Sequence, residues 1–415
     1  MTADSPVLLN QHARLTQAHY KILLVSWAGW VFDFYDLILF SFLLGPIGAE
    51  LGLSRGRLSY VLGASLAATA VGGALFGFLS DHFGRKRTLQ WTILAYSLGT
   101  LLCGFAVDLP TLLAFRIVTG LGVGGEWATG QTYVGETFPA PVRGRYGAFM
   151  QTGAPLGIAL ASVVGGFAAP VLGWRACFVL SFLPALLVVY IRRALPESDL
   201  WEKNRKRVGK GGPNRFAVLL SPAHRKFFLF ALVLALFDMS AYWFTYSWLP
   251  SYLNEERHFS MTKSAAWILV TQAGGLAGYL SFGIFADHYG RRLAFSVYSV
   301  LMAVGLLMVT LFWGAIVAWP VLILFFMFLV GFGTGMFGGY GPLFAELFPT
   351  SIRSTAMGTA FNLARGVQFF TPVLITLIAE HYGLAGGISV AAMFALLAGA
   401  WIWVFPETRG LVLED

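Results

Sequence analysis

The chain has 415 residues, of which 57% are hydrophobic and only 12% are charged, and its mean hydropathy is +0.71. A water-soluble core of this size could not bury so much apolar surface, so the composition excludes a soluble enzyme and indicates that a membrane is the solvent. The formal net charge of +8 falls mostly on one predicted face, which fits contact with anionic lipids better than nucleic-acid binding.

Residues 1–21 are polar and mixed in charge, with no short leader that ends in a small-residue cleavage site. We therefore expect the first apolar run to direct insertion, into the plasma (inner) membrane of a bacterium. Twelve apolar windows follow, each near the roughly 20 residues that a spanning helix needs. They cover residues 22–45, 59–80, 88–107, 110–135, 146–170, 174–194, 227–253, 265–286, 293–315, 319–344, 354–379 and 383–405. Because hydrocarbon offers backbone groups no hydrogen-bond partner, the windows predict an all-α membrane protein with twelve transmembrane helices.

The short segments between the windows alternate in charge. Basic residues are concentrated in every second segment, at Arg85, Lys86, Arg87, Arg143, Arg145, Arg291, Arg292 and Arg353. The positive-inside rule places these segments, and with them both termini, in the cytoplasm. The stretch 195–226 is polar and basic and separates two apolar halves. It predicts a cytoplasmic linker between an N-terminal six-helix lobe, residues 1–194, and a C-terminal six-helix lobe, residues 227–415.

Three motifs of the first half recur in the second half at nearly one offset. The pairs are 77–86 (GFLSDHFGRK) with 283–292 (GIFADHYGRR), 136–143 with 346–353, and 196–198 (PES) with 406–408 (PET). A shared offset predicts a duplicated unit and therefore two pseudo-symmetric six-helix bundles.

The paired loops have the pattern G-x-x-[SA]-D-x-x-G-R-[KR], which resembles the signature of the major facilitator superfamily between helices 2 and 3 and between helices 8 and 9. A narrower set of motifs, GLGVGGEW at 120–127, GWR at 173–175 and LPES at 195–198, is similar to the sialate:proton and lactate symporter group. Related metabolite:proton symporters share the GGE segment. The resemblance covers nearly the whole chain and implies a secondary transporter that is not an enzyme and needs no cofactor.

Some sialate carriers of that group have two extra spans in the middle of the chain. The stretch 195–226 is too polar to supply them, and this departure favours a smaller monocarboxylate, such as lactate or pyruvate. No nucleotide-binding loop of the form G-x-x-x-x-G-K-[ST] occurs in the sequence.

A charge inside the bilayer costs roughly 2.5–3.5 kcal/mol and so usually faces a cavity or a partner. Six ionisable residues stand out in the apolar windows. They are Asp33, Asp36, Arg116, Glu126, Asp238 and Arg365. At a rise of about 1.5 Å per residue, Asp33, Asp238 and Arg365 each lie about 16 Å into their helices. This depth is near the midplane of a hydrocarbon core of roughly 30 Å.

Arg365 is the leading candidate to anchor a substrate carboxylate, because a guanidinium presents a planar fork of donors. Asn362 and Gln368 lie three residues to either side and offer amides for a hydroxyl or keto oxygen. Tyr242, one turn from Asp238, is a further candidate for substrate contact. The alternative is that Arg365 pairs with Asp238 only to hold its lobe together.

Proton coupling is assigned to the buried carboxylates. Asp33 and Asp36 lie on adjacent turns of the first helix, where desolvation favours the protonated form, so at least one is a candidate proton carrier. Asp238 occupies the corresponding place in the seventh helix and is a second candidate. For Asp36 the alternative is a structural role, in which it caps a helix break or bonds a neighbouring hydroxyl.

The fourth helix carries two more charges. Arg116 lies about 9 Å below its outer end, and Glu126 lies about 15 Å deeper. Both could serve a proton path or a gate, and Arg116 could be a second cation for substrate. The alternative is a structural bridge from Arg116 to a carboxylate of the first helix.

Four charged residues stand at predicted cytoplasmic helix ends: Asp81, Arg85, Asp287 and Arg291. The resemblance implies a conformation-dependent cytoplasmic gate, and the alternative is simple loop structure. Cys103 and Cys177, the only cysteines, have no nearby histidine, so we expect packing roles and no metal site.

These features together predict proton-coupled symport of a small organic anion by alternating access, most simply a monocarboxylate. The expected partners are the anion, the proton and the lipid bilayer, with no nucleic acid, and the expected functional unit is a monomer. Two alternatives stay open. One is proton symport of sialate, a sugar, an aromatic acid or another metabolite, and the other is a membrane receptor that keeps the fold without transport.

Overall fold

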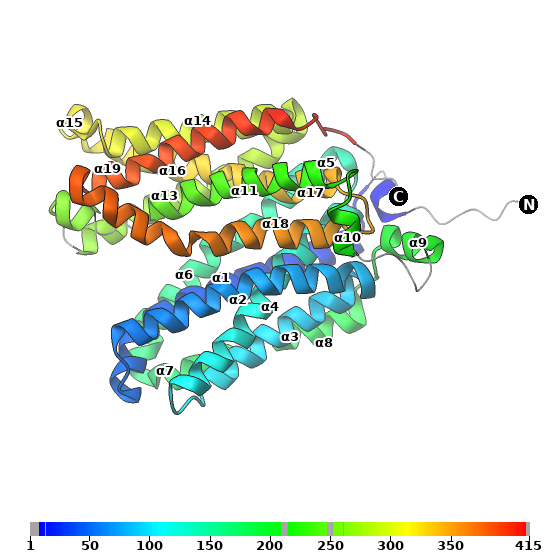
Figure 1. Ribbon diagram of the computed structural model, residues 1–415, viewed down its shortest axis with the longest axis horizontal. Helices are drawn as coiled ribbons and strands as arrows, with labels where there is room; N and C mark the ends of the chain where they lie inside the picture. Colours follow the sequence, from blue (N-terminus) through cyan, green and yellow to red (C-terminus); the bar gives the residue numbers. More distant parts are fainter. Residues whose placement is uncertain are drawn as a thin grey trace, which may run out of the picture.

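The computed structural model describes residues 8–12, 14–208, 215–246, 249, 252–259 and 261–411. Within these residues the chain is almost entirely helical and has no β-strand, so the all-α prediction is confirmed. Figure 1 shows two bundles of long helices that lie side by side. The first and last described segments lie at one end of the molecule, together with the short helices α9 (Asp199–Val208) and α10 (Arg215–Leu219). We call this the linker end; the charge pattern predicts that it faces the cytoplasm.

The N-terminal half supplies the first bundle. Its elements are η1 (Leu9–Gln11), α1 (Gln17–Leu51), α2 (Arg55–Phe83), α3 (Arg85–Cys103), α4 (Leu109–Thr137), α5 (Ala140–Gln151), α6 (Gly153–Val163), η2 (Val164–Ala168), α7 (Ala169–Leu180) and α8 (Ala185–Ala194). The predicted span 146–170 is thus divided among α5, α6 and η2.

The C-terminal half supplies the second bundle. Its elements are α11 (Arg225–Tyr246), η3 (Tyr252–Glu256), α13 (Met261–Tyr289), α14 (Arg291–Val309), α15 (Trp313–Ile316), α16 (Pro320–Gly333), η4 (Thr334–Gly339), α17 (Tyr340–Leu347), α18 (Arg353–Val367), η5 (Gln368–Phe370), α19 (Thr371–Trp401) and η6 (Ile402–Val404). Two predicted spans meet within α19, where Gly383 has a left-handed φ of 69°. Its counterpart in the first bundle is Gly173, with φ 80° inside α7. Glycine allows both breaks because it has no Cβ.

Among the described residues, seven helices are long and apolar enough to cross a membrane by themselves. Of the other predicted spans, 88–107 and 110–135 correspond to single, less apolar helices, α3 and α4. The spans 146–170, 174–194 and 354–379 are divided among shorter consecutive elements. The division of the chain at residues 194 and 227 stays a prediction, and positions 209–214 of the proposed linker lie outside the described residues.

Glycine brings neighbouring helices of each bundle into backbone contact. A Cβ at Gly124 of α4 would lie 2.0 Å from the Thr69 carbonyl oxygen of α2. In the second bundle, a Cβ at Gly331 of α16 would lie 1.8 Å from the Thr271 carbonyl oxygen of α13. In a membrane, helices associate without a hydrophobic driving force. Small residues stabilise the association because they allow close approach, which maximises van der Waals contact. The same device at related places supports the predicted duplication.

Candidate functional site

Asp33 of α1 and Arg365 of α18 face each other across the interface between the two bundles. Their nearest atoms, Asp33 Oδ2 and Arg365 Nη1, are 3.9 Å apart, and both residues are buried. Within the described residues, the two carboxylate oxygens of Asp33 have no hydrogen-bond partner, and the Nη1 of Arg365 has none either. Buried polar atoms are normally hydrogen-bonded, so this pair has unused capacity that a polar ligand can satisfy.

A small cavity of about 40 Å³ lies beside Arg365. Residues of both bundles border it, and most of them are aromatic. They are Trp30, Phe34, Gln151, Ala154, Met239, Tyr242, Trp243, Tyr279, Phe337, Phe361 and Arg365. The volume holds about one water molecule, whose share of liquid volume is roughly 30 Å³. A substrate therefore requires the bundles or the side chains to move apart.

An aromatic stack closes the side of the cavity that faces the linker end. Trp127 of α4 lies on Phe361 of α18 with ring centroids 3.7 Å apart. The Trp127 indole donates to Gln151 Oε1 at 3.0 Å, and the Gln151 amide donates to the Phe337 carbonyl at 3.2 Å. These contacts join the two bundles between the Asp33–Arg365 pair and the linker end. The sequence indicated only Trp127, as the residue after Glu126 in the GGEW motif, and gave no signal for Phe361 or Gln151.

Glu126 of α4 lies against the first helix. It is fully buried, and within the described residues neither of its carboxylate oxygens has a hydrogen-bond partner. A Cβ added at Gly29 of α1 would lie 2.1 Å from Glu126 Oε1, one turn of α1 from Asp33. Two predicted proton-coupling residues thus lie within one turn of each other along α1: Asp33 belongs to this helix, and Glu126 of α4 packs against it. The sequence analysis did not single out Gly29.

Gly29→Ala is expected to displace the Glu126 carboxyl group and to reduce transport. Overpacking of this kind lowers the free energy of unfolding by roughly 1–3 kcal/mol. Gly45→Ala is the matched control on the same helix, because a Cβ there meets nothing within 4 Å. We expect the control to keep or slightly raise thermal stability. The measurements are thermal unfolding and initial uptake rate, and equal behaviour of the two variants would contradict the close packing.

Asp36 and Arg116 form a buried ion pair inside the first bundle. Arg116 Nη1 lies 2.8 Å from Asp36 Oδ2, and its Nη2 donates to Ser65 Oγ at 3.2 Å. The Thr100 hydroxyl donates to the other Asp36 oxygen at 2.5 Å, and Phe40 lies under the guanidinium. This is the bridge that the sequence analysis held open as an alternative. Neither residue borders the cavity.

Asp238 lies buried in α11, and neither of its carboxylate oxygens has a hydrogen-bond partner in the described chain. The structure gives no ion pair between Asp238 and Arg365 among the described residues; the carboxylate that Arg365 faces is Asp33 of the other bundle. The geometry therefore does not support the alternative in which Arg365 pairs with Asp238 to hold the C-terminal lobe together.

The amides beside Arg365 point away from the cavity. Asn362 donates to the Gly124 carbonyl of α4 at 2.8 Å, and Gln368 donates to Ser240 Oγ of α11 at 3.2 Å. Three residues correspond to about 300° of helix, so each amide is rotated by about 60° from Arg365, to opposite flanks. Of the predicted substrate residues, the structure brings Arg365 and Tyr242 to the cavity.

At the linker end, Asp81 of α2 binds the first turn of α18 in the other bundle. Its carboxylate accepts from the Ser354 amide at 3.1 Å and from the Thr355 amide at 2.8 Å. Carboxylates stabilise helix N-termini because they satisfy free amide groups and the helix dipole. Arg85 pairs with Asp81 at 2.8 Å and with Glu136 at 2.7 Å.

The same arrangement recurs with the bundles exchanged. Asp287 of α13 accepts from the Gly144 amide at 3.0 Å and from the Arg145 amide at 2.8 Å, both in α5. Arg291 pairs with Asp287 at 2.7 Å and with Glu346 at 3.0 Å. All four predicted gate residues therefore lie in contacts that hold the bundles together at this end.

Two further arginines cross the interface. Arg353 lies 2.6 Å from Glu136, and Arg143 lies 3.2 Å from Glu346. Both glutamates thus bind an arginine of each bundle. In addition, Glu197 and Glu407 accept hydrogen bonds from the first amides of α3 and α14. The sequence showed these residues as repeated motifs but did not show their partners.

Comparisons with known proteins agree with this architecture. Residues 26–283 match the family model of the Major Facilitator Superfamily, and residues 314–415 match that of Sugar (and other) transporter. The probable 4-methylmuconolactone transporter of Cupriavidus pinatubonensis is 32% identical over 95% of this chain and 92% of its own length. The sialic acid transporter NanX of Escherichia coli is 29% identical, over 91% and 93% of the two chains. The niacin transporter NiaP of Acinetobacter baylyi is 28% identical, over 96% of each.

A solved structure of the proton:xylose symporter XylE has a TM-score of 0.77 to this chain, with 20% sequence identity, and covers 95% of this chain and 98% of its own. This likeness shows the same fold. The narrower likeness to the lactate symporter group stays a prediction. The superfamily model spans more than half of the sequence, and the chain belongs to the major facilitator superfamily.

Proposed function

We propose that the protein is a secondary transporter that carries a small organic anion together with a proton by alternating access. The observation that carries this proposal is the buried pair of Asp33 and Arg365, which come from different bundles and lie 3.9 Å apart with unsatisfied polar atoms. Substrate sites of such carriers lie near the membrane midplane between the repeats.

The coupling we propose is electrostatic. In the structure the Arg365 guanidinium faces the Asp33 carboxylate. A proton on Asp33 removes that negative charge and leaves Arg365 free to bind the carboxylate of the substrate. Both ligands then stabilise the state in which the bundles close around them, and this differential affinity shifts the conformational equilibrium. Glu126 and Asp238 are further proton sites under this proposal.

One central arginine favours a substrate with a single carboxylate, because a second charge would need another cation in the low-dielectric cavity. Arg116 does not supply that cation in this conformation, since it is paired with Asp36. The sequence analysis favours lactate or pyruvate. The aromatic lining of the cavity supports a second candidate class, carboxylic acids with a planar unsaturated ring. A flat ring of this kind can stack on aromatic side chains. Two relatives named for methylmuconolactone and niacin fit this class.

Uptake by purified protein in proteoliposomes at acidic outside pH tests the proposal. Labelled lactate and labelled nicotinate serve as substrates, with pyruvate, benzoate, succinate, sialate and xylose as competitors. Saturable uptake of lactate or nicotinate that needs the proton gradient supports proton:monocarboxylate symport, and the preferred substrate decides between the two classes. Binding without counterflow indicates a receptor. Robust transport of only succinate, sialate or sugar would overturn the assignment to a small monocarboxylate.

The linker-end contacts form the proposed cytoplasmic gate. Asp81→Ala removes the cap of α18 and one partner of Arg85, and each buried group left unsatisfied costs roughly 1–3 kcal/mol. We expect faster hydrogen exchange at Ser354 and Thr355 and slower uptake. Asp108→Ala is the control, because Asp108 caps α4 through a local contact with Thr111. If the amides of Ser354 and Thr355 exchange equally in both variants, Asp81 has no latch function.

A further inference from the structure

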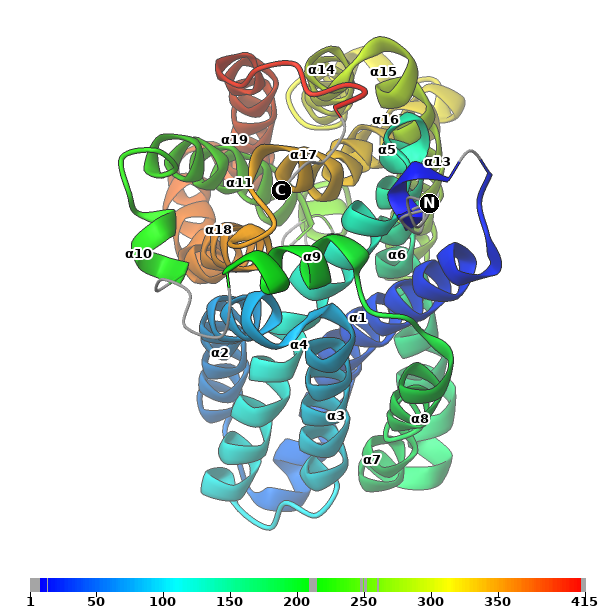
Figure 2. The same cartoon turned by 90° about the vertical axis from the view of Figure 1, so that its right-hand side faces the viewer.

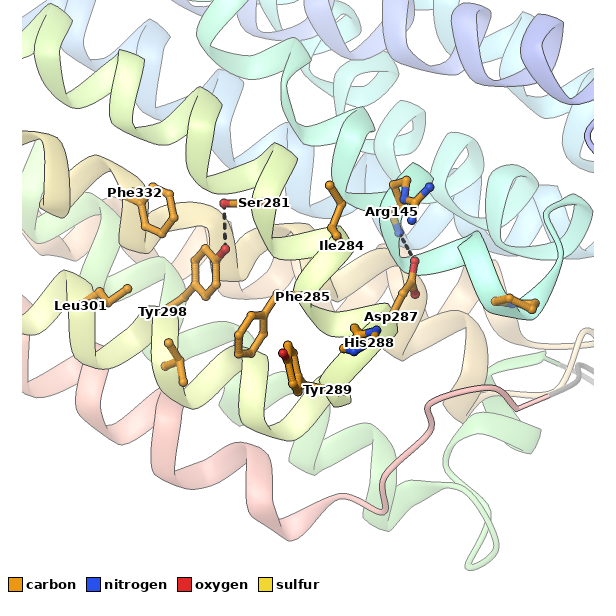
Figure 3. Close-up of a pocket in the computed structure, with 12 residues that line it drawn as sticks. Arg145, Ser281, Ile284, Phe285, Asp287, His288, Tyr289, Tyr298, Leu301 and Phe332 are labelled. Atoms are coloured by element: carbon orange, nitrogen blue, oxygen red, sulfur yellow. Dashed lines mark hydrogen bonds between the residues drawn. The ribbon is translucent and has the colours of Figure 1, made fainter.

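A groove of about 680 Å³ opens on the side of the second bundle near the linker end (Figure 3). Its walls belong to both bundles: Arg145 comes from α5, and Ile284, His288, Leu301 and Phe332 come from α13, α14 and α16. Ile284 is 53% exposed on a helix whose segment Ala266–Tyr289 is a candidate membrane span. The groove therefore opens toward lipid.

The polarity of the groove changes along its length. The part farther from the linker end is apolar, with Leu301 and Phe332, and the one hydroxyl pair there is satisfied, since Tyr298 donates to Ser281 at 2.8 Å. Arg145 and His288 lie at the other end (Figure 3). From His288 to Ser281 the groove follows α13 for about 10 Å. An apolar groove with a cationic end is complementary to an anionic phospholipid, which has an apolar tail and a negatively charged headgroup.

The charge at the polar end is available. Arg145 is exposed, and within the described residues its guanidinium has no hydrogen bond or ion pair; only its main-chain amide is bound, to Asp287. The neighbouring acid is already engaged, because Asp287 accepts from two amides of α5 and pairs with Arg291. The polar end thus presents an unpaired cation at the membrane surface.

The related place on the first bundle is covered by the chain itself. Ile284 corresponds to Phe78 in the repeated motif. The ring of Phe216, in α10, stacks on Phe78 with centroids 5.9 Å apart, and Figure 2 shows α10 beside α2 and α18. Arg145 has no arginine counterpart there, because Thr355 stands at the related position and donates to Asp81. The linker thus packs on Phe78 of the first bundle, whereas its counterpart Ile284 on the second bundle stays exposed.

We propose that the open groove binds one anionic phospholipid of the leaflet at the linker end. Its phosphate binds Arg145, and one acyl chain lies along α13 toward Phe332. The volume is within the roughly 300–1,000 Å³ of ligand sites, and anionic headgroups attract exposed arginine at the membrane surface. Because α5 and α13 belong to different bundles, the bound lipid stabilises the state in which the linker end is closed.

The test measures lipid binding by native mass spectrometry of the full-length protein, titrated with phosphatidylglycerol or phosphatidylcholine of identical acyl chains. Wild-type protein is expected to retain one phosphatidylglycerol more tightly than phosphatidylcholine. Arg145→Gln should weaken phosphatidylglycerol binding about fivefold, the factor that corresponds to roughly 1 kcal/mol per basic residue near the surface. Arg225→Gln is the matched control, since Arg225 is also an exposed arginine at the linker end.

Leu301→Trp fills the apolar part of the groove and should weaken binding of the acyl chain without a change of charge. Equal affinity for the two lipids would overturn the anionic preference. Binding that is unchanged in both Arg145→Gln and Leu301→Trp, or no retained lipid in wild type, would overturn the site. The titration contains no transport substrate, so its outcome is independent of whether the symport proposal holds.

Discussion

Arg365→Lys is expected to lose most uptake although the positive charge remains. An arginine holds a carboxylate with two parallel hydrogen bonds, and a lysine acts as a point charge that cannot reproduce this geometry. Arg365 borders the cavity and faces Asp33 at 3.9 Å. Loss of one charge-assisted hydrogen bond, worth roughly 1.5–3 kcal/mol, corresponds to an affinity about 10- to 100-fold weaker. Substrate affinity from thermal-shift titration and uptake from proteoliposomes measure this effect.

Arg175→Lys is the control for that experiment. Arg175 lies outside the cavity, pairs with Glu50 at 2.9 Å and donates to the carbonyls of Gly104 and Ala106 at 2.9 and 2.8 Å, so this variant measures what arginine replacement costs away from the substrate site. Near-normal substrate affinity in Arg365→Lys would remove its role as the anchor. Equal losses in both variants would indicate a general effect of arginine replacement on folding.

Asp33→Asn is expected to abolish accumulation against a gradient while substrate counterflow continues. The asparagine is neutral, like a protonated aspartate, so the carrier can still bind substrate at Arg365 and exchange it across the membrane. It can no longer release a proton, and a proton gradient therefore cannot drive it. Uphill uptake under an imposed proton gradient and counterflow at equal pH distinguish the two processes.

Asp238→Asn and Glu126→Gln are the comparison variants for Asp33. Asp238 was predicted as a proton site from its repeat-related position, yet only Asp33 of these residues forms an ion pair with Arg365 in the described chain. We expect the largest loss of coupling from Asp33→Asn. If the variants of Asp33 and Asp238 both still accumulate substrate, proton coupling takes place elsewhere, with Glu126 and Asp36 next to be tested.

The fold was predictable from the sequence because its signals are local and repeated. Apolar length fixes helices in a membrane, and a motif that occurs twice at one offset requires two related units. The superfamily follows from the loops 77–86 and 283–292 and is confirmed by the family model. The helix breaks within the predicted spans were less predictable, because they depend on packing against neighbouring helices.

The site was only partly predictable, since a residue's partner depends on tertiary structure. Depth along the helix placed Arg365 near the midplane, but rotation about the helix decides what a side chain contacts. Asn362 shares that depth and yet binds Gly124 of α4. Gly29 carries no chemistry of its own and matters only because Glu126 packs on it. The stack of Trp127 on Phe361 joins residues far apart in the chain, which no sequence spacing connects.

The buried pair of Asp33 and Arg365 also determines how the carrier responds to voltage. In the empty state the two opposite charges cancel. With a proton on Asp33 and a monoanion on Arg365 the sum is again zero. With one proton per cycle, on Asp33 and not on Glu126 or Asp238, both states that cross the membrane are electroneutral. Neither state then does the work of roughly 2.3 kcal/mol that moving one elementary charge through 100 mV involves. The pH difference across the membrane, and not its electrical potential, would then be the driving force for transport.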